Sequence, residues 1–138
     1  MSADDRKAHF RRYVDAYNRS ADDELDLYVT SDYVHHSNGD ALTLEQFKRG
    51  AAWLRAAMPD LVVEAVDLVG EGDRVAARWI GRGTHQNSMF GEHASGRQIA
   101  IYGITVYRFS DDGRIAEDWE VFDEGDLRRQ AAVSTDAT

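Results

Sequence analysis

The spacing of hydrophobic residues changes about halfway along the chain. Up to Pro59, the only proline, apolar positions recur every three or four residues, which is typical of helices with one buried face. Residues 6–19, for example, place Phe10, Val14 and Tyr17 on one such face. Beyond Pro59 the period approaches two, as in half-buried strands. The pattern therefore predicts helices first and strands later.

Capping signals divide the first half of the chain into three helices. After the first helix, Ser20 fits the N-cap of a short helix over residues 22–29. Thr43 is predicted to begin a third helix because Gln46 follows it in capping-box spacing, and Pro59 ends that helix. The predicted core stripe of this helix is Leu44, Phe47, Ala51, Leu54 and Met58.

Five segments are predicted to be extended. They are residues 32–36, 61–69, 74–85, 99–109 and 114–122, separated in the second half by turns rich in Gly and Asp. Three helices against one strongly curved, mainly antiparallel sheet form an α+β fold, and a sheet wrapped around a helix would enclose a pocket lined from both sides. We expect a single domain over residues 1–138, with a frayed tail at 131–138.

Composition and charge narrow the classes of function. The chain has 138 residues and no cysteine, so neither disulfides nor a thiol nucleophile is available. A net charge of −9 argues against nucleic acid or an anionic membrane as the principal partner. No apolar run is long enough to span a bilayer, and residues 1–6 lack the pattern of a secretion signal. We therefore expect a cytoplasmic protein that binds neither membrane nor nucleic acid.

A carboxylate interrupts an otherwise apolar strand face near the end of the chain. If the last hairpin closes at residues 111–113, Thr105 lies opposite Asp118, with a slip of one residue left open. A carboxylate on such a face is costly to bury, and burial raises its pKa toward values useful for proton transfer. Asp118 is therefore the main candidate for acid–base chemistry. In the alternative interpretation this face is the outer one, and Asp118 is solvated or paired with Arg108 or Arg114.

Two adjacent histidines offer a second titratable group. His35 and His36 share an extended segment, so their side chains point to opposite sides and at most one lines the pocket. We expect His36 to be that residue and to orient Asp118 or relay its proton. His85 and His93 fall at a polar loop, where solvated side chains are expected. No His-x-His or His-x-x-x-His pair favours a metal site, so neither a metal nor another cofactor is expected.

Bulky aromatic and sulfur-containing residues recur through both halves of the chain. Such residues most often form the core, but some of them can leave a cavity shaped for a flat, apolar or aromatic ligand. The candidate substrate-binding residues are Tyr13, Tyr17, Trp53, Met58, Trp79, Met89, Phe90 and Ile101.

Several short motifs, in their order and spacing, resemble the SnoaL-like polyketide cyclase family. They include Tyr33-Val34-His35-His36, Met58-Pro59-Asp60-Leu61, Gly70-Glu71-Gly72-Asp73-Arg74, Ser95-Gly96-Arg97 and Glu117-Asp118-Trp119. The resemblance covers about residues 6–130. It implies a cone-shaped α+β barrel of the nuclear-transport-factor-like superfamily with a deep hydrophobic pocket, assembled as a homodimer or homotetramer.

The resemblance also implies a chemistry. In these cyclases an Asp before the late Trp acts as acid and base beside a His on the neighbouring strand, and the matching positions here are Asp118 and Thr105. Threonine can donate a hydrogen bond but cannot carry a proton away, so the pair is incomplete. We expect a cofactor-independent enzyme that closes a ring in an aromatic polyketide by an aldol reaction. The alternatives are a cofactor-free hydroxylase of an anthracycline-like substrate and a non-catalytic small-molecule-binding domain.

Overall fold

Helices dominate the first half of the chain and long strands the second half, as the hydrophobic periods predict. In the computed structural model, which describes residues 1–133, the elements are α1 (Ala3–Asn18), α2 (Asp22–Leu25), β1 (Val29–Ser37), β2 (Asp40–Thr43), α3 (Leu44–Ala57), β3 (Val62–Glu71), β4 (Arg74–Thr84), β5 (Gln98–Phe109), β6 (Ile115–Phe122) and α4 (Glu124–Ala132). The sequence patterns did not predict β2 or α4. Within the described residues, no helix combines the length and apolar character needed to cross a membrane.

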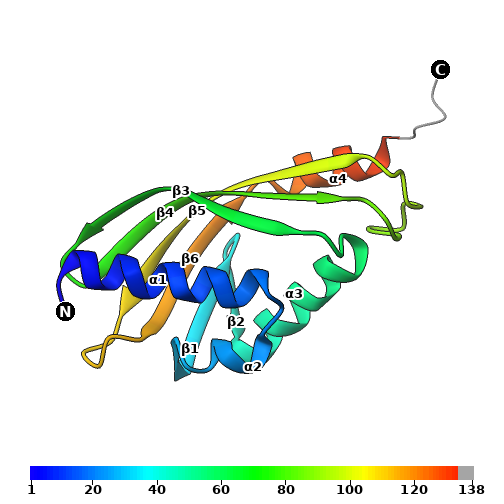
Figure 1. Ribbon diagram of the computed structural model, residues 1–138. Coiled ribbons are helices and arrows are strands. Elements are labelled where there is room, and N and C mark those ends of the chain that lie inside the picture. Colours follow the sequence, from blue (N-terminus) through cyan, green and yellow to red (C-terminus); the bar gives the residue numbers. More distant parts are fainter. Residues whose placement is uncertain (134–138) are drawn as a thin grey trace.

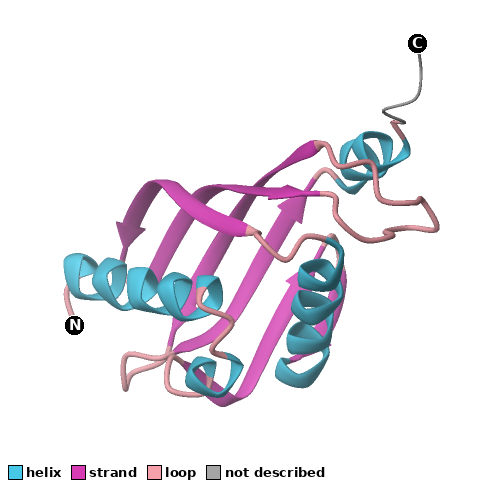
Figure 2. Cartoon of the chain, turned by 45° about the vertical axis from the view of Figure 1, so that its right-hand side comes forward, coloured by secondary structure: helices cyan, strands magenta, loops and turns pink. Residues whose placement is uncertain are grey.

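The six strands form one curved sheet in the order β2–β1–β6–β5–β4–β3 (Figure 1). β1 and β6 pair in parallel, and the other neighbouring strands pair antiparallel. Helices α1, α2 and α3 lie on one face of the sheet, and α4 packs near the end of β5 (Figure 2). The edge strands β2 and β3 do not pair with each other. The predicted α+β fold is confirmed, with a strongly curved sheet that stays open.

Local capping explains where two of the helices begin. Ser2 caps α1, and Thr43 caps α3 through the predicted capping box with Gln46. The prediction for α2 is wrong: its N-cap is Ala21, and Ser20 instead turns the chain with a left-handed φ of 56°. Helix α2 is a single turn, and Val29 already belongs to β1.

Two apolar clusters fill the concave side of the sheet. The first joins α1 to the strands and includes Phe10, Tyr13, Leu25, Tyr33, Tyr107 and Phe109. The second lies at the other end and includes Ala57, Met58, Leu61, Met89, Ile99, Leu127 and Ala131. Because Leu127 and Ala131 bury one face of α4, residues 131 and 132 are helical, and the prediction of a frayed tail from 131 is wrong there. Residues 134–138 lie outside the described residues.

The register of the last hairpin differs from the prediction by two residues. Asp118 lies opposite Tyr107, and Thr105 lies opposite Glu120. A longer turn and a β-bulge next to it shift the pairing, and neither is visible as a local sequence signal. Because side chains alternate with a period of two, a two-residue shift leaves every residue on its predicted face.

Candidate active site

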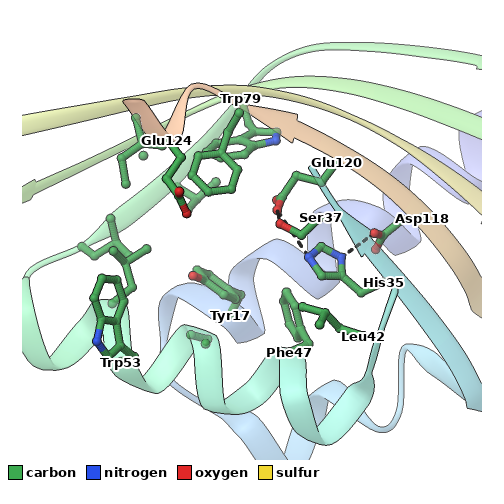
Figure 3. A pocket seen from close by; sticks show the side chains of 18 of the residues that line it. Tyr17, His35, Ser37, Leu42, Phe47, Trp53, Trp79, Asp118, Glu120 and Glu124 are labelled. Atoms are coloured by element: carbon green, nitrogen blue, oxygen red, sulfur yellow. Dashed lines mark hydrogen bonds and ion pairs between the residues drawn. The ribbon is translucent and has the colours of Figure 1, made fainter. Parts of the chain in front are cut away.

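An apolar cavity of about 280 Å³ lies between α1, α3 and the concave face of the sheet (Figure 3). Six of the predicted ligand-contacting residues line it: Tyr13, Tyr17, Trp53, Trp79, Phe90 and Ile101. Met58 and Met89 do not line it; both are fully buried in the second apolar cluster. The expectation that these two methionines face the cavity is therefore wrong, because Met58 caps the end of α3 and packs inward there.

Asp118 lies at the inner end of this cavity on β6, and its side chain is almost completely buried. The Tyr33 hydroxyl donates a hydrogen bond to Oδ2, and Nδ1 of His35 lies 2.5 Å from Oδ1. Burial raises the pKa of Asp118, while the hydrogen bonds and charge of His35 and the bond from Tyr33 oppose that rise. The interpretation that places Asp118 on a solvated outer face is wrong.

His35, not His36, is the histidine that faces the cavity. The parallel pairing of β1 with β6 sets His35 level with Asp118 and His36 level with Trp119, so each histidine shares a face with its partner. Nε2 of His35 lies 3.3 Å from Oε2 of Glu120. Burial disfavours the imidazolium, but the hydrogen bonds and charges of Asp118 and Glu120 outweigh this penalty and raise the pKa of His35 to about 9.

His36 lies on the convex face of the sheet. Its ring stacks on Trp119 with a centroid distance of 5.4 Å, and Nε2 lies 2.7 Å from Oε2 of Glu117. The prediction that His36 is the pocket histidine is therefore wrong. The alternation of side chains along residues 32–36 is as predicted. Which of the two sides faces the cavity, however, depends on pairing with β6, more than 80 residues away in the chain.

Thr105 supports the cavity wall without lining it. Its buried hydroxyl accepts a hydrogen bond of 3.0 Å from the indole N–H of Trp79. The Trp79 ring crosses Gly103, where an added Cβ would lie 2.2 Å from a ring atom. The absence of a side chain at residue 103 thus lets the indole lie flat against β5, and Thr105 fixes its orientation.

Three buried tyrosines surround Asp118. Burial, followed by nearby charges that include Asp118, raises the pKa values of Tyr13, Tyr33 and Tyr107 well above the usual value. These phenols therefore remain neutral hydrogen-bond donors. Tyr33 and Glu120 were not among the predicted site residues, although Tyr33 shares the two-residue alternation of β1 with His35.

The mouth of the cavity carries a linked set of polar and aromatic side chains. Glu124 of α4 forms a 3.3 Å ion pair with Arg128, whose guanidinium lies 4.1 Å from the ring centroid of Phe90. Phe90 in turn contacts Trp53 of α3 edge-on. Among the described lining residues the acidic side chains are Asp118, Glu120 and Glu124, and none is Lys or Arg.

His85 and His93 do not line the cavity, and the described residues offer no metal site. His93 is exposed as expected, but His85 is buried and its Nδ1 lies 3.1 Å from the Ser95 hydroxyl, so the expectation of a solvated His85 is wrong. Within residues 1–133, no three His, Cys, Asp or Glu side chains are grouped so that they could hold a metal ion.

Comparisons with known proteins agree with this fold. The model of the SnoaL-like polyketide cyclase family matches residues 7–131. AclR from Streptomyces galilaeus, described as "a putative hydroxylase", is 28% identical with a TM-score of 0.86, over 94% of this chain and 97% of that chain. IdmH from Streptomyces antibioticus, described as "a putative polyketide cyclase", is 25% identical with a TM-score of 0.84, over 93% and 99%. A SnoaL-like polyketide cyclase from Agrobacterium tumefaciens is 28% identical with a TM-score of 0.75, over 94% and 98%. No curated protein sequence matches this chain.

Proposed function

Because this chain belongs to the SnoaL-like polyketide cyclase family, we propose that it is a cofactor-independent acid–base enzyme that closes a ring in an aromatic polyketide. The observation that carries the proposal is the buried carboxylate of Asp118, paired with His35 at the inner end of an apolar cavity. Perturbed titratable groups in an apolar cavity are the usual signature of proton-transfer sites.

Asp118 is the group to which we assign the proton transfer. It removes a proton from a carbon next to a carbonyl, and the electron pair left behind spreads into that carbonyl as an enolate. The enolate carbon forms a bond to a second carbonyl carbon of the same molecule, whose oxygen becomes an alkoxide. Asp118 then returns its proton to the alkoxide, so the enzyme ends as it began and no electrons are gained or lost.

His35 supplies the positive charge that this carboxylate needs. The family pattern places an imidazole on the neighbouring strand at the position that Thr105 occupies, and here an imidazole reaches the carboxylate from β1 instead. A buried carboxylate without a partner would stay protonated and could not act as a base. The Asp118–His35 pair therefore offsets the missing histidine at 105, while Thr105 orients the Trp79 wall.

The aromatic walls fit a flat substrate. Trp79, Tyr17 and Phe47 surround the space in front of His35, as Figure 3 shows. Holding the two reacting carbonyl carbons close together lowers the entropic part of the barrier. We expect the cavity to contribute by folding the substrate chain, in addition to the base.

A hydroxylase is the second candidate, favoured by the similarity to AclR. In this alternative Asp118 deprotonates a reduced, anthraquinone-like ring of an anthracycline-like substrate, and the carbanion carbon bonds to dioxygen as a hydroperoxide. The reduced ring then gives up two electrons and two protons and becomes the quinone, the O–O bond breaks, and the second oxygen atom leaves as water. The base and the flat substrate are the same as in the cyclase. A non-catalytic domain that only binds a small molecule is the third alternative.

Assembly into a homodimer or homotetramer is a further part of the proposal. The convex face of the sheet exposes Tyr102, Ile104 and Val121, and Ile104 lies directly opposite Val121 in the β5–β6 pair. Clustered exposed apolar side chains are typical of surfaces between subunits. Analytical ultracentrifugation of the protein and of Ile104→Asp tests this, because the substitution should shift the assembly toward monomers.

Mass spectrometry of a panel of aromatic polyketides, incubated with the protein in the presence and absence of oxygen, tests the reaction. Ring closure gives either an isomer of unchanged mass or the loss of one water, together with a new chromophore, and it does not need oxygen. Hydroxylation adds the mass of one oxygen atom relative to the quinone form of the substrate, and it requires oxygen. Unchanged substrates across the panel, with binding retained, would contradict both enzymatic proposals and leave the binding domain.

A further inference from the structure

His35 is held at both ring nitrogens by carboxylates of a single strand. Nδ1 lies 2.5 Å from Asp118, and Nε2 lies 3.3 Å from Glu120. Asp118 and Glu120 are two residues apart on β6, so both face the cavity side, and His35 reaches between them from the parallel strand β1. The Ser37 hydroxyl donates a 3.2 Å hydrogen bond to the same Glu120 oxygen that contacts His35.

Burial decreases along this row of groups toward the cavity. The side chain of Asp118 is 1% exposed, that of His35 6% and that of Glu120 19%. Figure 3 shows Glu120 and Ser37 beside the His35 ring on the side away from Asp118. Glu120 is therefore the group in this row that is most accessible from the cavity, and Asp118 is the most deeply buried.

A buried Asp–His pair has two ways to share one proton. The proton can sit on the imidazole, which gives two charges, or on the carboxylate, which gives two neutral groups. Low solvent access favours the neutral form, because both charges lose their hydration. A protonated Asp118 could not accept a proton from a substrate. The ionised form therefore needs support from a third group.

We propose that Glu120 is a positioning residue that keeps His35 as an imidazolium and thereby keeps Asp118 ionised and able to accept a proton. The proposal rests on the proposed function of Asp118. The charge of Glu120 contacts the imidazole directly and lies on the side opposite Asp118, so its attraction to His35 exceeds its repulsion of Asp118. Ser37 holds the Glu120 carboxylate in that orientation.

The other groups packed against His35 do not supply this charge. Phe47 of α3 contacts the ring edge-on at 4.8 Å, and Tyr33 of β1 stacks at 6.4 Å with a neutral phenol. Within residues 1–133, Asp118 and Glu120 are the acidic groups that pair with His35. Tyr13 and Tyr107 lie near Asp118 and stay protonated.

Titration of His35 by NMR on the full chain with 15N-labelled histidine tests the proposal directly. In the native protein His35 should hold both ring protons up to about pH 9. Glu120→Gln keeps the shape and an acceptor oxygen but removes the charge, so the titration midpoint should fall by about one pH unit, a tenfold loss of proton affinity. Glu124→Gln is the matched control, because Glu124 lines the same cavity but pairs with Arg128. An unchanged midpoint in Glu120→Gln would overturn the proposal.

If Glu120→Gln does not fold, Ser37→Ala tests the same proposal. This substitution removes the hydrogen bond that orients Glu120 and leaves every charge in place. It should lower the same midpoint by a smaller amount, about threefold in proton affinity. No shift in this variant would contradict the role of Glu120 as an oriented group.

A carbon-acid probe separates this proposal from the proposed function. 2-Tetralone is a flat aromatic ketone whose acidic carbon exchanges hydrogen for deuterium in D2O, and proton NMR measures the rate. The protein should accelerate the exchange, and Asp118→Asn should abolish the acceleration. Glu120→Gln should reduce the acceleration about threefold at about pH 8.5, between the two titration midpoints, where His35 is mostly imidazolium in the native protein and mostly neutral in the variant. Acceleration that survives Asp118→Asn contradicts the proposed function. Acceleration that is lost in Asp118→Asn but unchanged in Glu120→Gln contradicts only the role of Glu120.

Discussion

Two imidazole–carboxylate pairs lie one residue apart on the same two strands, and they differ in burial and in the groups around them. His35 and Asp118 face the cavity, with side chains 6% and 1% exposed. His36 and Glu117 face the convex side, with side chains 26% and 25% exposed. The first pair has neutral tyrosines and apolar walls around it, whereas the second stacks on Trp119 and lies beside Arg108.

The difference shows that burial, and not the pairing itself, makes a pair a candidate for catalysis. Water screens the outer pair, so it contributes little to the free energy of unfolding. The outer pair also lies outside the cavity, so it does not face a bound ligand. The inner pair loses most of its hydration, so each charge depends strongly on the other. Substitutions in the two pairs and a change of pH should separate them, and a change in the charge of a ligand should test the cavity itself.

Asp118→Asn should have the largest effect. Removing a well-placed acid–base group costs about 10²–10⁴-fold in rate, and Asn is nearly isosteric with Asp, so the fold should remain. Glu117→Gln is the matched outer control, and it should change the rate by less than about threefold because an exposed pair contributes little. Initial rates on the polyketide converted in the mass-spectrometry panel measure both. Equal losses in the two variants would contradict the contrast between the faces.

His35→Gln should destabilise the protein more than His36→Gln. Breaking a buried pair leaves the Asp118 carboxylate without its partner and costs about 3–5 kcal/mol of unfolding free energy. Breaking the outer pair should cost about 0–1 kcal/mol. Urea unfolding followed by tryptophan fluorescence measures both free energies. If His36→Gln proves the more destabilising, the assignment of the buried pair as the stronger interaction is wrong.

The stability of the protein should fall as the pH rises from about 6.5 to about 9. Hydrogen bonds to Asp118 and Glu120 outweigh the cost of burial and raise the pKa of His35 to about 9 from an unfolded value of 6.5, so the folded state binds this proton more tightly. The contribution is fully present below pH 6.5 and is lost as the pH approaches 9. Thermal unfolding across this range should show the decline in the native protein and in His36→Gln, and a much smaller decline in His35→Gln. A native protein that is equally stable at both limits would contradict the shift.

The charge of a ligand should have the smallest of these effects. The described lining of the cavity contains three acidic side chains, one imidazolium at His35, and no Lys or Arg, so its net charge is negative and an anionic ligand meets repulsion. One unit charge about 10 Å away costs roughly 1.7 kcal/mol at an effective dielectric constant of 20, which is about tenfold in affinity. Anthraquinone-2-carboxamide should therefore bind about tenfold more tightly than anthraquinone-2-carboxylate, as measured by quenching of Trp53 and Trp79. Glu124→Gln should narrow the difference, and equal affinities in the native protein would count against a charge-selective cavity.

Local patterns in the sequence determined most of the fold. Helical and strand periods located three helices and the five longer strands, and the Thr43–Gln46 box marked the start of α3. Alternation also placed Asp118 on the same face as the buried apolar residues of β5, because face depends only on odd or even spacing. The two-residue slip of the hairpin did not disturb that prediction. The periodic patterns did not predict β2 or α4, because a strand of four residues and a helix with mixed polar residues carry weak periodic signals.

Long-range strand pairing sets which residues surround Asp118. The choice between His35 and His36 depends on the parallel pairing of β1 with β6, two strands that are far apart in sequence, and no spacing within either strand reveals that pairing. The same pairing brings Glu120 to His35, and the packing of α3 turns Met58 into the core and away from the cavity. Periodicity reports how each segment alternates between two faces, whereas the face that becomes interior depends on where distant segments pack.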